Sequence, residues 1–473
     1  MKKMKKVLAL LLSATLAAGC VAGCLTGCSD MTFDDDIYND DATPEELGAN
    51  PNAPEITLVH WDSSGSLEGA VLNTVLKQFY ATHPNGQKIR VKVEIMGMYE
   101  QTMPTILASS DEDKPEIIMM PDGNFNSWMA QYASQFENLD PYIAESGFDE
   151  TELWDGAVSR YKYKYENNTH VFGEGSVYAL PKDVSPNVMF YNKDFFAEKG
   201  VEIPKNADGS IKRMTIEEGV ELWEKLIVGE EDKDVLNRRY ALGNMPPESM
   251  VWSAGSDFLN EDRTGFITDA DDIAGFKKAY QMMVDLVDKG IVPDGTSISG
   301  TSTSTLFLTG KVACYIGGIY DTAQLRNASF DWDITYIPAF EENINVNGYS
   351  GSVGYAMWSG TDESLKDLAY SVIEYISSEE AQRIMTEMGF NIPLQKSIAE
   401  DTAFIDAQRA KKPESYEVFL ESLRYQPSGT WRYTRNDVWR DRLDTEAAKL
   451  YQNNGYTVDD FVAALPAIVN GAL

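Results

Sequence analysis

The spacing of hydrophobic positions changes repeatedly between two and three to four residues after residue 55. Short runs of β-branched and aliphatic residues predict three strands, at 56–61, 88–96 and 115–120. Apolar positions three and four apart predict helices between and after them, at 66–80 and 99–109 and from 127 onward. Strands that alternate with helices in this way indicate a parallel sheet with crossover helices.

The order of elements differs in the rest of the chain, where no internal repeat is evident. Further strands are predicted at 177–180, 188–191, 312–316, 333–337 and 352–358. Further helices are predicted at 216–227, 274–289, 304–309, 365–377, 379–388, 434–450 and 458–469. The first sheet therefore ends near Leu180, and a second region follows. The strand at 352–358 comes where a return to the first region is expected.

The N-terminus has the features of an export signal. Four lysines precede an apolar stretch at 7–16, which is too short for a membrane span. Residues 25–28 resemble the bacterial lipoprotein processing site, which implies cleavage after a 1–27 signal peptide and a lipid on Cys28. Cys20 and Cys24 follow rival sites, and an ordinary signal peptide is the alternative. The acidic, Pro- and Asn-containing segment 28–54 then predicts a flexible tether.

Charge and cysteine content restrict the partners. The formal net charge is -34, and cleavage would remove four lysines and make it more negative. Nucleic acid is excluded as a partner, because phosphate binding needs a basic surface. Contact with an anionic membrane is expected only through the lipid anchor. With Cys28 lipidated, Cys314 has no partner for an intrachain disulfide, and its apolar surroundings predict a buried small side chain.

Segment 178–196 resembles a signature of the extracellular solute-binding proteins of ABC importers, in the carbohydrate-binding group that includes the maltose-binding protein. Segments 307–321, 330–338, 348–358 and 377–393 follow the same family order. Lys182 departs from the family, which usually has an apolar residue there. The resemblance spans about residues 55–470 and implies an α/β, two-lobe periplasmic-binding-protein-like fold (type II), with a ligand cleft between lobes joined by crossing strands. It assigns 55–183 and 353–395 to lobe 1, and 184–352 and 396–473 to lobe 2.

A sugar offers hydroxyls that need carboxylates or amides, and a C–H face that packs on an aromatic ring. Such residues should follow strands, because ligands of open α/β sheets bind beyond the carboxyl ends of strands. In lobe 1 and at the crossings the candidates are Trp61, Asp62, Tyr99, Asp122, Asp183 and Ser352. In lobe 2 the candidates are Trp252, Tyr320, Asp321, Trp431 and Arg432. For Asp183, Trp252, Tyr320 and Trp431 the resemblance itself implies a place in the ligand site.

The resemblance implies a monomeric, lipid-anchored protein on the outer face of the cell membrane. It would capture a carbohydrate, expected to be an oligosaccharide, by lobe closure and deliver it to an ABC permease, without a cofactor, metal or catalytic residue. One alternative is a secreted glycoside hydrolase, for which paired carboxylates can always be proposed. The Gly-x-Ser-x-Gly elbow and zinc-ligand spacings are missing from the sequence. The other alternative is the same fold with a cationic or peptide solute. The acidic loop at 269–272 predicts a helix N-cap rather than a calcium site.

Overall fold

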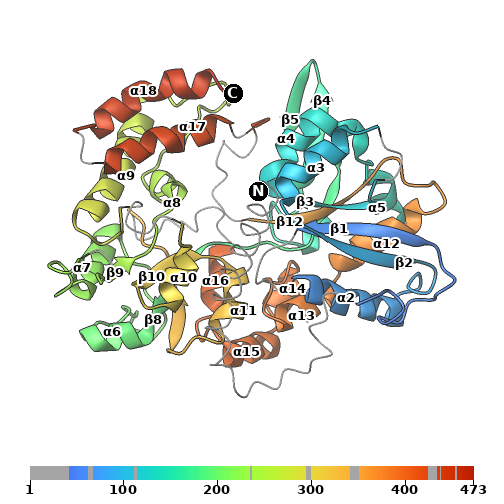
Figure 1. Cartoon of the computed structure of the whole chain (residues 1–473), viewed down its shortest axis with the longest axis horizontal. Helices are drawn as coiled ribbons and strands as arrows, with labels where there is room; N and C mark the ends of the chain where they lie inside the picture. The colour runs from blue at the N-terminus through green and yellow to red at the C-terminus, as the bar shows by residue number, and fades with distance from the viewer. Residues whose placement is uncertain are drawn as a thin grey trace, which may run out of the picture.

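The computed structural model describes residues 42–61, 68–110, 114–234, 237–294, 300–340, 351–423, 434–436, 438–452 and 455–473. They form two α/β lobes that lie side by side, with helices α14, α15 and α16 at the base between them (Figure 1). The predicted Cys28, Cys20, Cys24, Asp62, Trp431 and Arg432 lie outside the described residues.

The first lobe is built on a five-stranded sheet with the order β2-β1-β3-β12-β7. Its strands are β1 (Glu55–Trp61), β2 (Arg90–Met96), β3 (Ile117–Pro121), β7 (Ala179–Pro181) and β12 (Val353–Met357). β1 pairs in parallel with β2 and β3, whereas β12 is antiparallel to both of its neighbours. All five residues of β3 and of β12 are buried, as expected for central strands whose two faces are both covered.

The helices that cover the first sheet come from two separate parts of the chain, residues 68–146 and 366–387. They are α2 (Glu68–Thr82), α3 (Tyr99–Ala108), α4 (Asp122–Tyr132), α5 (Asp140–Ser146), α12 (Lys366–Ile376) and α13 (Glu379–Glu387). The strand–helix alternation predicted for the first 130 residues is confirmed. Helix α4 begins at Asp122, five residues earlier than predicted, because it starts directly where β3 ends.

The second lobe contains a four-stranded sheet with the order β11-β8-β10-β9. Its strands are β8 (Val188–Asn192), β9 (Tyr240–Leu242), β10 (Val312–Gly317) and β11 (Trp332–Thr335). Its helices are α6 (Lys193–Lys199), α7 (Ile216–Leu226), α8 (Pro247–Ser253), α9 (Ala270–Asp288), α10 (Thr303–Leu308), α11 (Thr322–Leu325), α17 (Val438–Ala447) and α18 (Val458–Asn470). Cys314 is a free, fully buried residue of β10, as predicted. Asp269 caps α9 by accepting from the backbone N–H groups of Asp271 and Asp272, which confirms the predicted cap.

Two crossing segments join the lobes next to each other. The chain leaves the first sheet after β7 and enters the second at β8, and it returns to the first sheet at β12. It then passes through α14 (Lys396–Ala399), α15 (Thr402–Lys411) and α16 (Glu417–Leu423). Phe419 of α16 packs on Phe190 of β8, with 6.2 Å between ring centroids. One hydrophobic cluster therefore continues from the first lobe to the inner face of the second sheet, and another fills the opposite side of that sheet.

A β-hairpin that the sequence analysis missed projects from the first lobe. It consists of β4 (Lys162–Glu166) and β5 (Thr169–Phe172), and β6 (Ser176–Val177) pairs with its inner end. The two-residue turn uses Asn167 and Asn168 at φ 52° and 61°, a conformation that Asn tolerates well. Lysines alternate with tyrosines along β4, so the strand lacks the apolar run on which the other strand predictions relied.

The flexible tether predicted for residues 28–54 includes residues that the structure shows to be folded. Residues 43–54 are folded against β2, where Glu45 forms an ion pair with Arg90 at 2.9 Å and Ala49 is buried in the core. Leu47 packs against the same core. The prediction was wrong for this part because two small apolar contacts and one ion pair compensate for an otherwise polar composition.

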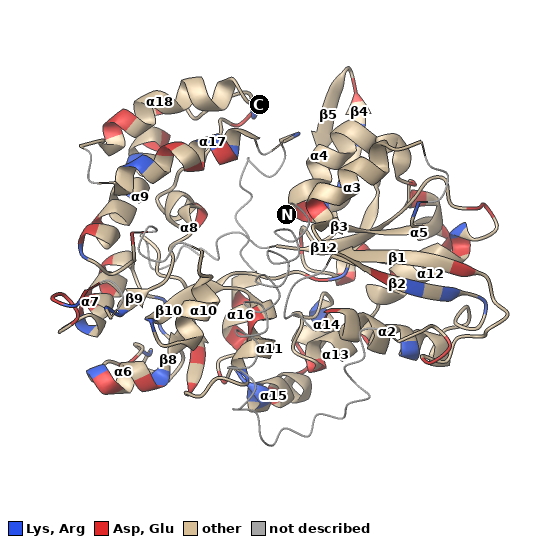
Figure 2. Ribbon diagram, viewed as in Figure 1, with Lys and Arg blue, Asp and Glu red and all other residues tan. Residues whose placement is uncertain are grey.

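Acidic and basic side chains are interspersed on the helices of both lobes (Figure 2). None of the helices in the described part of the chain combines the length and the apolar character that crossing a membrane requires.

A substitution of Gly354 in β12 tests how tightly the crossing is packed. A Cβ atom there would lie 2.8 Å from the carbonyl oxygen of Leu180 and 3.0 Å from the ring of Tyr161. We expect Gly354→Ala to lower the free energy of unfolding by about 1–3 kcal/mol, because the neighbouring strand must shift. The control is Gly97→Ala, whose new Cβ would meet nothing within 4 Å. Equal urea unfolding midpoints for the two variants would contradict this packing.

Candidate functional site

The first-lobe candidates meet at one edge of the sheet. Trp61 ends β1, Asp122 follows β3 and Asp183 follows β7. Ser352 immediately precedes β12, whose antiparallel direction brings its start to the carboxyl ends of its neighbours. The backbone N–H of Asp122 donates to the carbonyl of Ser352 at 3.0 Å. The structure therefore brings these residues together where ligands of α/β sheets bind.

Asp183 and Ser352 tie the two crossing segments to each other. The Ser352 hydroxyl donates to the backbone carbonyl of Asp183 at 2.6 Å, and the backbone N–H of Val353 donates to the Asp183 carboxylate at 2.7 Å. Tyr161 donates its hydroxyl proton to Ser352 Oγ at 2.9 Å. Ser352 is buried, so its hydroxyl serves the crossing itself. Burial raises the pKa of Asp183, although Lys182 and the Val353 N–H act in the opposite direction.

Asp122 is neutralised by Arg160, a residue that the sequence analysis did not single out. Arg160 Nη1 lies 2.7 Å from Asp122 Oδ2, and both side chains are only 8% exposed. Arg160 precedes β4, and its Nε also donates to the carbonyl of Gly156. The sequence offered no signal for this pair beyond the presence of an arginine before the hairpin.

Trp61 is half-buried at the end of β1, and its indole N–H donates to Glu68 Oε2 at 2.5 Å. Glu68 begins α2 and also contacts His60 and Lys182. Neither His60 nor Glu68 was among the predicted site residues. Both lie within eight residues of Trp61, yet nothing in the local pattern distinguishes them from ordinary strand and helix positions.

The structure does not support Tyr99 as a ligand contact in this conformation. It is buried, and its hydroxyl donates to the carbonyl of Met119 at 2.6 Å. The preceding Met98 is instead 74% exposed and has φ 51° and ψ 42°, the left-handed region that side chains other than glycine rarely adopt. This conformation turns Met98 outward just after β2 and Tyr99 inward as the first residue of α3. Met98 is therefore the better candidate at this turn.

In the second lobe, Tyr320 and Asp321 lie on a short 3-10 turn, Ile319–Asp321, directly after β10 and Gly318. Tyr320 is 56% exposed, whereas Asp321 is buried and accepts from the Gln324 amide at 2.9 Å. The backbone N–H of Ile319 donates to Ser185 Oγ at 3.2 Å, so this turn touches the first crossing segment. The crossing thus connects Tyr320 and Asp321 with the first-lobe candidates.

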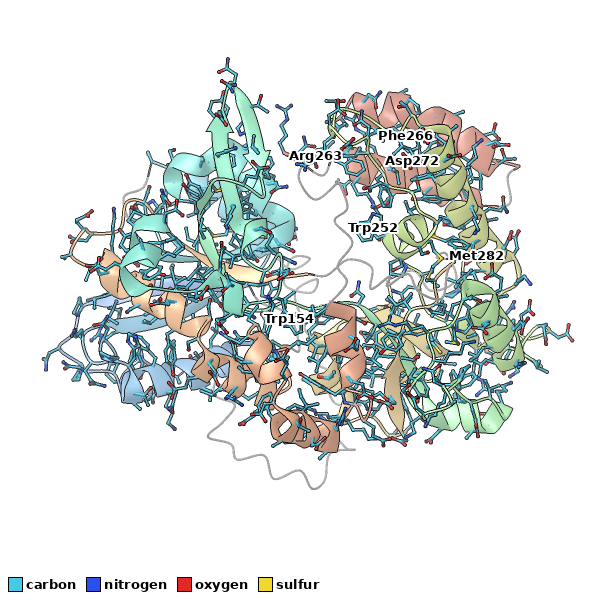
Figure 3. All side chains as sticks on the ribbon, turned by 180° about the vertical axis from the view of Figure 1, so that it is seen from behind. Trp154, Trp252, Arg263, Phe266, Asp272 and Met282 are labelled. Atoms are coloured by element: carbon cyan, nitrogen blue, oxygen red, sulfur yellow. The ribbon has the colours of Figure 1, made fainter. Side chains whose placement is uncertain are left out.

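Trp252 lies on α8, on the side of the second lobe that faces the first (Figure 3). It is 8% exposed, and its indole N–H donates to Asp257 at 3.2 Å. Most of its surface packs in the second-lobe core, so a smaller part is available to a ligand than for Tyr320.

The site resembles a binding surface more than a catalytic centre. Its acids are mainly held by cations or by backbone N–H groups. In the part of the chain that the structure describes, no group of three or more His, Cys, Asp or Glu side chains is arranged to hold a metal ion.

Two lobes with a polar and aromatic edge at their crossing are the arrangement expected of a solute-binding protein. The family model of the bacterial extracellular solute-binding proteins matches residues 63–383, so the chain belongs to this family. The two-lobe fold expected from the sequence is confirmed.

Individual relatives are distant. The galactooligosaccharide-binding protein of Bacillus subtilis strain 168 is 25% identical over 272 residues, which is 56% of this chain. The match spans 58% of that relative's length.

Two solved structures resemble the chain over most of its length. An ABC substrate-binding protein of Listeria monocytogenes in complex with cycloalternan has a TM-score of 0.70 at 20% identity, covering 89% of this chain and 99% of that one. UgpB of Mycobacterium tuberculosis in complex with glycerophosphocholine has a TM-score of 0.69 at 17% identity, covering 88% and 98%. At these identities the likeness concerns the fold.

Asp321 predicts a defined pH dependence of stability. Burial raises its pKa to about 6, with the Gln324 amide acting against the shift. Between pH 4 and 6 the folded protein keeps a proton that the unfolded chain has released, so this residue lowers stability as pH rises through the window. The full loss is at most about 3 kcal/mol. We expect Asp321→Asn to remove this loss, measured as urea midpoints at pH 4.5 and 7.

The exposed Asp232 supplies the matched control, and Asp232→Asn should keep the wild-type pH dependence. Parallel pH profiles for wild type and Asp321→Asn would show that the buried carboxyl does not titrate in this range.

Proposed function

We propose that this chain is the solute-binding protein of an ABC importer and that it captures a neutral carbohydrate, an oligosaccharide, between its lobes. Lobe closure around the sugar would produce the form that docks on the permease. Its family membership supports the general role. The relative from Bacillus subtilis is named for galactooligosaccharides, and the Listeria structure contains cycloalternan, which supports a sugar as the ligand.

The observation that carries the proposal is that the carboxylates of Asp122 and Asp183 each lie against a cation. Asp122 is paired with Arg160, and Asp183 is paired with Lys182 at 3.2 Å. Paired carboxylates still accept hydrogen bonds from hydroxyls, but they attract a cation much less than free carboxylates do. The exposed ring of Tyr320 and the thioether of Met98 add apolar surface for the C–H face of a sugar. A neutral, hydroxyl-rich ligand therefore fits better than a cationic or peptide solute.

A thermal-shift and calorimetry panel tests this function. The panel contains mono- and oligosaccharides, glycerophosphocholine and polyamines, and product analysis after incubation tests the hydrolase alternative. We expect an oligosaccharide to raise the melting temperature without turnover. Tyr320→Ala should weaken its binding about tenfold or more through lost ring contact, with little change in stability because the ring is largely exposed.

The control is Tyr165→Ala, which removes a similarly exposed tyrosine (58%) from the β4–β5 hairpin. It should leave affinity unchanged. Binding of polyamines but not sugars, or release of sugar products, would contradict the proposed function.

We also propose that the mature protein is held at the outer face of the membrane by a lipid on Cys28. The resemblance of residues 25–28 to a lipoprotein site supports this, as does a net charge unsuited to adhesion on anionic lipid. Cys28→Ser should move the protein from the membrane fraction to the soluble exported fraction, detected by immunoblotting. Cys20→Ser and Cys24→Ser are the controls, and release by either of them alone would assign the anchor to that cysteine instead.

A further inference from the structure

A buried cluster of charged groups lies beneath the first-lobe part of the site. His60 of β1, Glu68 of α2, and Lys182 and Asp183 after β7 form a chain of contacts. The distances are 3.2 Å from His60 Nε2 to Glu68 Oε2, 3.5 Å from Glu68 to Lys182, and 3.2 Å from Lys182 to Asp183. The exposed fractions of these side chains run from 0% for His60 to 17% for Asp183. Each of the four contacts a predicted site residue or is one: His60 and Glu68 contact Trp61, Lys182 contacts Asp183, and Asp183 is itself predicted.

We infer that His60, Glu68 and Lys182 are positioning residues of the ligand site, and that the cluster takes up a proton when the lobes close on a ligand. The inference rests on the proposed function for its setting, because it assumes that a ligand covers this edge of the sheet. It concerns groups that hold Trp61 and Asp183 in place rather than groups that touch the ligand.

The hydrogen bonds of His60 fix its tautomer. Nδ1 lies 2.9 Å from the carbonyl oxygen of Trp61, and a carbonyl only accepts, so Nδ1 carries a hydrogen. In neutral imidazole, Nε2 then presents a lone pair to the Glu68 carboxylate. Nε2 is buried and has no hydrogen-bond partner among the described residues. A proton on Nε2 would convert this repulsive contact into an ion pair at 3.2 Å.

The charge balance requires the same proton. With Lys182 protonated and both Glu68 and Asp183 ionised, the cluster with neutral His60 has a net charge of about -1. The other groups that face it are uncharged donors and rings: the Trp61 indole, the Val353 N–H, and the Tyr355 ring 6.2 Å from His60. Gln382 of α13 donates to the carbonyl of Lys182 and adds no charge. One added proton makes the cluster neutral.

The access of water to the cluster determines whether His60 carries the additional proton. Burial lowers the pKa of His60 to about 4, against the opposing effect of Glu68, so at neutral pH without a ligand the imidazole is neutral. Glu68 and Asp183 still have some exposed surface. A ligand that displaces this water removes the solvation of two carboxylates, and an uncompensated buried charge then becomes costly. Proton uptake relieves this cost.

Lys182 determines how strongly ligand binding is coupled to proton uptake. It contacts both carboxylates, at 3.5 Å to Glu68 and 3.2 Å to Asp183.

Calorimetry of the bound sugar in two buffers with different ionisation enthalpies measures the protons taken up. We expect uptake of up to one proton near pH 6, and affinity that rises by up to tenfold per unit as pH falls from 7.5 to 5. Glu68→Gln leaves Lys182 and Asp183 balanced without a proton. It should bind at pH 7.5 with no proton uptake and a flat pH profile. Lys182→Arg should retain uptake, because it keeps the charge.

The exposed Glu145 provides the control, and Glu145→Gln should behave like the wild type. Sugar binding with no proton uptake in the wild type would overturn the inference while leaving the proposed function intact. Failure of every sugar to bind would instead count against the proposed function.

A measurement on the wild type keeps the inference testable if Glu68→Gln does not fold. The chain has three histidines, so imidazole nitrogen NMR with His60→Asn for assignment can identify His60. We expect the Nδ1–H tautomer in the free protein and an imidazolium in the sugar complex at pH 6. An Nε2–H tautomer in the free protein, or a neutral ring in the complex, would contradict the inference.

Discussion

The join between the two crossing segments is the constraint on which the rest of the structure depends. Asp183 accepts from the backbone of Val353, Ser352 donates back to Asp183, and Ser185 and Gly351 exchange two backbone hydrogen bonds at 2.9 and 3.1 Å. These bonds join the two crossing segments to each other at the edge of the first-lobe sheet, to which both β7 and β12 belong. The join therefore lies next to the candidate site, where the chain passes between the lobes.

The region around this join both connects the two lobes and forms part of the candidate ligand site. Side chains that tie the crossing together are neighbours of the side chains that would meet a ligand, and most of the charged groups there lie against a group of opposite charge. Buried ion pairs are costly unless each partner is well satisfied. The Asp122–Arg160 pair at 2.7 Å meets this requirement. The contact between His60 and Glu68 does not, and for that reason it is the point where a change of protonation has the largest effect.

Local sequence patterns predicted best those elements that have a regular hydrophobic spacing and a cap residue of their own. The helix predicted at 274–289 is α9, Ala270–Asp288, and the predicted Asp269 cap is present. The hairpin at 162–172 escaped notice because its outer face is charged and only its inner face is aromatic. At the β2–α3 turn a single residue in the left-handed region exchanged the expected roles of Met98 and Tyr99. Propensity does not specify such a turn, since it depends on what the following helix packs against.

The sequence by itself determined the alternation of strands and helices, the family signature that implies two lobes, and the excess of acidic residues. Those properties follow from composition and short-range spacing. Only the tertiary structure decided which acids are paired. Arg160 reaches Asp122 across 38 positions, and Lys182 reaches Glu68 across 114. No local period encodes contacts at such separations, because they exist only after the sheet has brought the ends of distant strands to one edge.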